Sequence, residues 1–111
     1  MRIINFGFAV EFELLTIYKS NTMNIEIFNQ TRETLNQLMS DSDSFFRQFG
    51  GLDDTVYSDG VIPRKYKELT GLSISVLTRC EECILYHIQG CIAEKASKYE
   101  MIEAIKIGVI G

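Results

Sequence analysis

The chain has 111 residues and a mass of 12.7 kDa, which is the size of a single domain. Its net charge of −4 argues against a nucleic-acid partner, because no excess of lysine and arginine is present to neutralise phosphates. There is no basic run to bind a membrane surface, and no apolar run approaches the roughly 20 residues that a bilayer span needs. We therefore expect neither a nucleic-acid nor a membrane partner.

The first 22 residues differ in pattern from the rest of the chain. Apolar and polar side chains alternate between Ile4 and Leu14, which is the period of a strand. From Met23 onward the pattern becomes helical, and Met23 could itself be an alternative start. The sequence thus predicts an N-terminal arm or appendage over residues 1–22, whose role the pattern leaves open, and a helical domain over residues 23–111.

The helical part begins with a predicted helix over residues 25–39. Residues 40–44 (SDSDS) are rich in helix-capping side chains and predict a break. A short helix over residues 45–49 should follow, ended by Gly50 and Gly51.

Residues 53–60 are typical of a turn or a short helix. Pro63 suits the first turn of the next helix, where its missing N–H costs nothing. That helix, over residues 64–77, is almost wholly apolar after Glu68, which predicts a central position.

Two capping boxes predict the starts of the last two helices. Thr78 and Glu81 form the first box, opening a helix that runs to about residue 94, and Ser97 and Glu100 form the second. Because every element after residue 22 is helical in pattern, the fold class predicted is all-α.

Two of the three cysteines form the motif Cys80-Glu-Glu-Cys83, and His87 follows four residues later. On a helix these residues share one side with Cys91, and Cys80 and Cys83 are close enough to form a disulfide. Near a helix N-terminus, unpaired N–H groups and the helix dipole lower a thiol pKa below about 8.5. His87 could relay a proton to or from sulfur. The motif therefore indicates thiol-redox chemistry.

Other interpretations of the same cysteines remain open. Zinc needs four converging ligands, whereas Cys80, Cys83 and His87 supply three at most, so we expect no metal site. Free cysteines are often core residues, and for Cys91 core packing is the favoured interpretation. So few cysteines do not make a secreted disulfide scaffold, which favours a reducing, cytoplasmic compartment.

The spacing Glu68-(eleven residues)-Cys80-x-x-Cys83-x-x-x-His87 resembles the signature of the alkylhydroperoxidase D-like members of the carboxymuconolactone decarboxylase family. Residues 67–111 resemble that family throughout, residues 41–66 more loosely, and residues 1–22 not at all. The resemblance implies an all-α fold in which the Glu68 helix packs against the Cys80–His87 helix, in a homo-oligomer, usually a trimer or hexamer.

The resemblance also implies a function. Cys83 would attack a hydroperoxide, Cys80 would resolve the sulfenic acid as a disulfide, and Glu68 and His87 would form the proton relay. A dithiol reductant or a lipoyl-type redox protein would then reset the pair, and no cofactor is implied. Alternatives are a thiol–disulfide oxidoreductase or redox adaptor acting on a protein partner, and a non-catalytic helical interaction module.

Three features depart from the family pattern. Lys95 stands where a helix-ending glycine is usual, and Cys91 where alanine is usual. The family also commonly continues past the position of Gly111 into a further helix. We therefore expect either that a C-terminal helix is missing or that the N-terminal arm covers its surface.

Overall fold

The structure is a computed structural model that describes residues 26–111. Among these residues helices alternate with short connections and no strand occurs, which confirms the all-α prediction. They fall into two compact units that divide between Val56 and Tyr57, and each is described by itself. The predictions for residues 1–22 lie outside the described residues.

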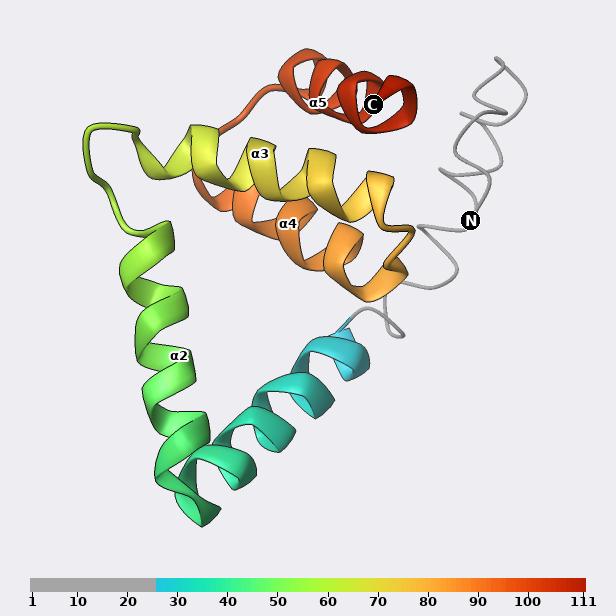
Figure 1. Cartoon of the computed structure of the whole chain (residues 1–111). Coiled ribbons are helices and arrows are strands. Elements are labelled where there is room, and N and C mark those ends of the chain that lie inside the picture. The colour runs from blue at the N-terminus through green and yellow to red at the C-terminus, as the bar shows by residue number, and fades with distance from the viewer. Residues whose placement is uncertain (1–25) are drawn as a thin grey trace. The chain divides into compact units, whose positions relative to one another are not determined.

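The first unit contains a helical stretch over residues 26–42 and helix α2, Ser44–Tyr57, except for its last residue, Tyr57, which belongs to the second unit (Figure 1). The predicted break over residues 40–44 is wrong in extent, because the helix continues to residue 42. Only Asp43 interrupts it, and the Asp43 carboxylate accepts a hydrogen bond from the backbone N–H of Phe45 at 2.7 Å. Asp43, one of the capping residues from which a break was predicted, thus caps the helix that follows directly.

Gly50 and Gly51 do not end α2, so the predicted short helix over residues 45–49 is wrong. The helix runs on to Tyr57, so residues 53–57 of the predicted turn or short helix over residues 53–60 belong to α2. Neither glycine has a positive φ, so neither makes the left-handed turn that ends a helix. Glycine weakens a helix interior by about 1 kcal/mol relative to alanine, which is too little to stop it.

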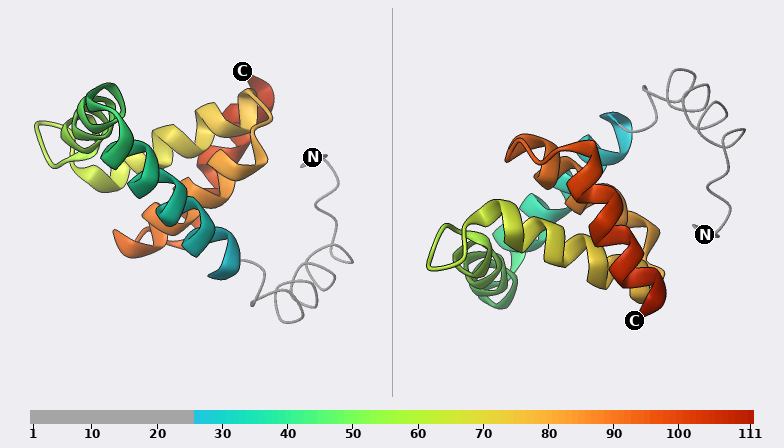
Figure 2. Two further views of the ribbon diagram at one scale, coloured as in Figure 1. Left: turned by 90° about the horizontal axis from the view of Figure 1, so that it is seen from below. Right: turned by 90° about the horizontal axis from the view of Figure 1, so that it is seen from above.

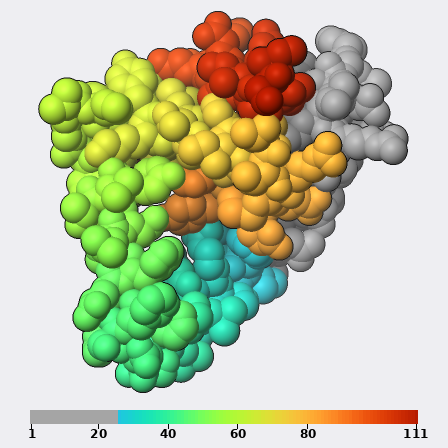
Figure 3. All heavy atoms as spheres, in the orientation of Figure 1, coloured from blue at the N-terminus to red at the C-terminus, as the bar shows by residue number. Residues whose placement is uncertain are grey.

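The second unit is built from α3 (Arg64–Leu77), α4 (Glu81–Ala93) and α5 (Lys98–Ile110). Helix α3 packs against both of the others and lies between them, as predicted (Figures 1 and 2). In the space-filling view the side chains of α5 rest directly on those of α3 (Figure 3). The buried apolar core consists of Leu72, Val76, Ile84, Cys91 and Ala104.

The ends of these helices follow local chemistry. Pro63 is the N-cap residue of α3 rather than part of its first turn. Ser97 and Glu100 form the predicted capping box at the start of α5, with both reciprocal hydrogen bonds present. Helix α4 ends where Lys95 takes a left-handed conformation, with φ of 60°. This is the backbone geometry that favours glycine, the residue usual at this position in the family that the sequence resembles.

Candidate active site

A tight turn between α3 and α4 fixes the position of Cys80. Arg79 is left-handed, with φ of 56°. Its N–H donates to the carbonyl of Val76, and the N–H of Cys80 donates to the carbonyl of Ser75. This pair of bonds is the Schellman ending of a helix, and it delivers Cys80 directly to the start of α4.

The capping box predicted at Thr78 is therefore wrong, although the predicted extent of α4 is nearly right. Thr78 is the C-cap of α3, and its hydroxyl donates back to the carbonyl of Ile74 at 3.0 Å. The N-cap of α4 is Cys80. The left-handed turn at Arg79 decides this, because it places the N-cap of α4 at Cys80, two residues later than the predicted capping box requires.

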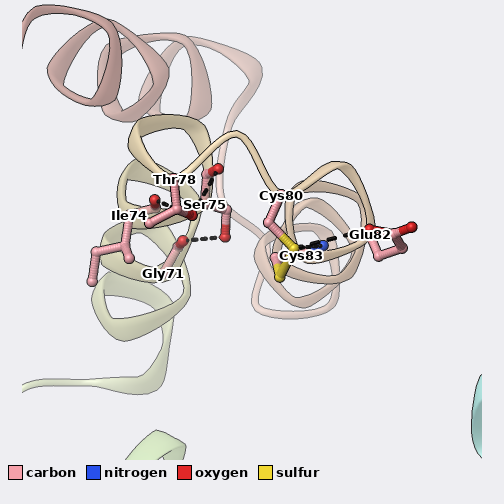
Figure 4. Close-up of a disulfide and its surroundings, with 7 residues drawn as sticks. All are labelled: Gly71, Ile74, Ser75, Thr78, Cys80, Glu82 and Cys83. Atoms are coloured by element: carbon pink, nitrogen blue, oxygen red, sulfur yellow. Dashed lines mark hydrogen bonds between the residues drawn. A yellow bond between two sulfur atoms is a disulfide. The ribbon is translucent and has the colours of Figure 1, made fainter. Parts of the chain in front are cut away.

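Cys80 and Cys83 are joined by a disulfide, with their Cα atoms 5.2 Å apart (Figure 4). The sulfur of Cys80 accepts a hydrogen bond from the backbone N–H of Cys83 at 3.3 Å. A thiolate at this N-cap would face the unpaired N–H groups and the positive end of the helix dipole. The carboxylate of Glu82, 4.0 Å from the Cys80 sulfur, opposes that effect in part. Both cysteines are half-buried, so the disulfide is reachable.

Glu68 and His87 form a buried pair between α3 and α4. Their Oε2 and Nδ1 atoms are 2.9 Å apart, and the two residues are 1% and 9% exposed. Glu68 is the fifth residue of α3, beyond its first turn, so its carboxylate serves His87 rather than the N-terminus of its own helix. In a neutral imidazole, Nδ1–H donates to this carboxylate and leaves Nε2 as the acceptor.

Three further residues, none of them predicted from the sequence for this role, surround this pair. Arg64 Nε lies 3.5 Å from the other carboxylate oxygen of Glu68, and the spacing of four residues between them was an available signal. The rings of Tyr57 and Tyr86 pack against His87, with centroids 5.3 and 5.1 Å from it. No pattern in the sequence indicates these aromatic contacts, because Tyr57 comes from a different helix.

Cys91 is a free thiol and belongs to the core, as predicted. Its side chain is fully buried, and this burial, together with the negative charges of Glu68 and Glu100, raises the pKa of Cys91 to about 11. A thiol with that pKa stays protonated near neutrality and is a poor nucleophile. Cys91 therefore does not compete with the disulfide pair.

Within residues 26–111, no three histidine, cysteine, aspartate or glutamate side chains converge as metal ligands. In the same part of the chain, no helix is both long and apolar enough to cross a bilayer.

The described helices and their site define an all-α dithiol protein, with a CxxC disulfide opening one helix and a buried Glu–His pair between that helix and its neighbour. Comparison with known proteins goes further, since the family model "Carboxymuconolactone decarboxylase family" matches residues 43–110. The chain belongs to the carboxymuconolactone decarboxylase family.

Two crystal structures of one Thermotoga maritima protein of this family are similar to the chain. The first is 38% identical, covers 75% of this chain and 71% of its own, and has a TM-score of 0.70. The second is 37% identical, covers 77% and 75%, and has a TM-score of 0.71. That protein has been suggested to take part in an antioxidative response.

Two curated bacterial relatives are similar over shorter stretches, and both are uncharacterised. One, from Cupriavidus necator, is 26% identical over 55% of this chain and 54% of its own length. The other, encoded in the cox locus of Paracoccus denitrificans, is 32% identical over 51% of each. The chain thus spans about half the length of the curated relatives it matches.

Proposed function

We propose that the protein is a thiol-dependent peroxidase that reduces hydroperoxides through a Cys80/Cys83 dithiol–disulfide cycle. The observation that carries the proposal is the arrangement on α4: a disulfide opens the helix, and His87, buried against Glu68, follows Cys83 by one turn. Residues four apart on a helix project from the same side, which supports a role for His87 at the Cys83 sulfur.

In the first step His87 takes the proton of the Cys83 thiol at Nε2, and Glu68 stabilises the imidazolium that forms. The Cys83 thiolate attacks the terminal oxygen of the hydroperoxide. A sulfur–oxygen bond forms as the oxygen–oxygen bond breaks, so sulfur is oxidised to a sulfenic acid and the peroxide is reduced. The alkoxide that leaves takes the proton back from His87 and departs as an alcohol.

In the second step the Cys80 thiolate attacks the sulfenic sulfur of Cys83. The disulfide forms, and hydroxide leaves as water with the proton that Cys80 gave up. The N-cap position favours this thiolate, because the N–H of Cys83 already donates to the Cys80 sulfur. A dithiol reductant or a lipoyl-type redox protein then resets the pair by exchange, becoming a disulfide itself. A cycle that depends on such donors fits the cytoplasm.

The test is consumption of cumene hydroperoxide with dithiothreitol as the dithiol donor. Cys83→Ser should abolish turnover, whereas Cys91→Ala should retain it, because Cys91 packs in the core. Glu68→Gln and His87→Ala should slow turnover by about 10²–10⁴-fold, the usual contribution of general acid–base groups, with little change in helicity by circular dichroism. Full activity in Cys83→Ser would remove the proposal.

A second candidate function is thiol–disulfide exchange with a protein partner, and one observation favours it. Cys80 is the sulfur at the N-cap, which is where the attacking thiol of a dithiol oxidoreductase has its pKa lowered. In that case Cys83→Ser would trap a mixed disulfide on Cys80, and wild-type protein would turn over peroxide slowly or not at all. If neither cysteine traps a mixed disulfide, and both thiols react as fast as an ordinary peptide thiol, the result would instead favour a non-catalytic interaction module.

We also propose that the protein works as a homo-oligomer, a trimer or hexamer by its resemblance to the family. Helix α2 supports this, because Phe45, Phe49, Leu52 and Val56 recur every three or four residues on one side of it. Each is 61–66% exposed, and exposed apolar faces of this kind mark interaction surfaces. Sedimentation equilibrium of the full chain tests the proposal, and a monomer at assay concentration would contradict it.

A further inference from the structure

Helices α3 and α4 each contain an interior glycine at their contact. Gly71 is buried in α3, and Gly90 is half-buried in α4. Neither has a positive φ, so neither is needed for a special backbone conformation. Glycine disfavours a helix interior relative to alanine, so two of them at one helix contact require a packing reason.

The space at Gly71 is filled by the imidazole of His87. A Cβ atom built on Gly71 would lie 2.6 Å from Nδ1 and 2.8 Å from Nε2 of that ring. Non-bonded carbon atoms rest at about 3.5–4.0 Å, so a methyl group and the ring cannot both occupy these positions. His87, which comes from α4, therefore packs against Gly71 of α3.

The space at Gly90 is filled in the reciprocal way. A Cβ atom built on Gly90 would lie 2.9 Å from Oε1 of Glu68, and the other two atoms of that carboxylate are closer still. The three nearest neighbours of this Cβ therefore all belong to the carboxylate that binds His87. Each glycine makes room for the side chain that the opposite helix contributes to one hydrogen bond.

We propose that Gly71 and Gly90 are reciprocal positioning residues, which hold the Glu68–His87 pair in register by leaving space for each partner on the opposite helix. The inference deepens the proposed function and rests on it for its catalytic consequence. A methyl group at either position must displace the imidazole or the carboxylate and so break the 2.9 Å contact between them. The acceptor atom Nε2 then moves relative to Cys83.

Gly108 of α5 provides a matched control. A Cβ atom there would also be crowded, by the backbone carbonyl of Ser73 and at 2.8 Å by Cβ of Val76. Those atoms belong to the contact between α3 and α5 and not to the Glu68–His87 pair. Gly108→Ala therefore imposes comparable crowding without touching either relay side chain.

The first experiment measures the NMR signals of the His87 imidazole, and it does not depend on enzymatic activity. His87 is the only histidine of the chain, so its imidazole ¹H and ¹⁵N signals are unambiguous. Gly71→Ala and Gly90→Ala should shift these signals and change the tautomer pattern, whereas Gly108→Ala should leave them at wild-type positions. Imidazole signals at wild-type positions in both Gly71→Ala and Gly90→Ala would overturn the proposal.

A double-mutant cycle guards against variants that fold poorly. If the methyl group of Gly90→Ala collides with the Glu68 carboxylate, its loss of melting temperature should shrink when Glu68→Ala is also present. The same holds for Gly71→Ala combined with His87→Ala. Equal losses in both backgrounds would overturn the proposal, because the crowding would then come from elsewhere.

The last experiment separates this inference from the proposed function. In the peroxide assay, Gly71→Ala and Gly90→Ala should lower kcat on the order of 100-fold per folded molecule, the scale for a misplacement of about 1 Å, while Gly108→Ala should not. Wild-type protein that turns over no peroxide would sink the proposed function, and the histidine signals would still decide the positioning role. A wild-type kcat in both Gly71→Ala and Gly90→Ala would refute the positioning role and leave the proposed function standing.

Discussion

Replacing Lys95 by glycine should stabilise the protein, because Lys95 holds a backbone conformation that suits glycine. Its φ is 60°, and it is the residue just past the C-cap of α4. The N–H of Lys95 donates to the carbonyl of Ile92, and that of Ala96 donates to the carbonyl of Cys91, as in a Schellman ending. Glycine at position 95 keeps both hydrogen bonds. It also removes the close contact between Cβ and the following carbonyl oxygen that destabilises a left-handed residue.

The size of the effect follows from two opposing terms. A left-handed residue other than glycine costs about 1–2 kcal/mol, and glycine loses about 0.5–1 kcal/mol more conformational freedom on folding. Lys95→Gly should therefore raise the free energy of unfolding by about 0.5–1 kcal/mol. For a domain of this size that corresponds to an increase in melting temperature of about 2–6 °C.

Thermal unfolding followed by circular dichroism measures this shift, with Lys106→Gly as the control. Lys106 is exposed in the interior of α5, where the same change of residue should cost about 0.5–1 kcal/mol. The two variants remove the same charge, so their difference isolates the backbone. A lower melting temperature in both variants would refute the left-handed assignment at residue 95.

Three further predictions concern caps, the core thiol and the contact between helices. Ser97→Ala should lower the free energy of unfolding in urea by about 1 kcal/mol, and Thr78→Ala clearly less, since of these two residues only Ser97 caps a helix N-terminus; equal losses would contradict the cap assignment. Because burial raises the pKa of Cys91 to about 11 from 9.0, oxidised protein should react with iodoacetamide at least about 100-fold more slowly than a peptide thiol near neutrality, and free-thiol rates would refute this. The folded protein keeps this proton when the unfolded chain loses it, so the associated stability is present below pH 9 and should fall as pH rises toward about 11. Ser73→Ala should cost about 1 kcal/mol in urea unfolding, because the hydroxyl of Ser73 donates to the carbonyl of Ala104 at 2.8 Å across α3 and α5, and an unchanged midpoint would contradict this.

Elements with strong local signals could be predicted from the sequence. Pro63 and the apolar run after Glu68 predicted the bounds of α3, and the Ser97–Glu100 capping box predicted the start of α5. The errors fell where two local signals competed. Gly50 and Gly51 resembled a helix end but lie within α2, and Thr78 resembled an N-cap but closes α3.

For the candidate site, the spacing of Cys80, Cys83 and His87 placed all three on one helix, because residues three and four apart face the same way. The spacing also predicted that Cys80 and Cys83 are close enough to form a disulfide, and the structure contains this disulfide. Pairing of Glu68 with His87 came only from the resemblance to the family. Nothing in the intervening residues states how α3 and α4 are aligned.

The sequence by itself determined the helical periods and the motif that opens α4, because these depend on neighbours within a few residues. Tertiary structure alone decided which side chains meet across α3 and α4. The left-handed turn at Arg79 sets the direction in which α4 returns along α3. Close approach at Gly71 and Gly90 then sets the alignment at which a carboxylate and an imidazole, nineteen residues apart, form a buried hydrogen bond.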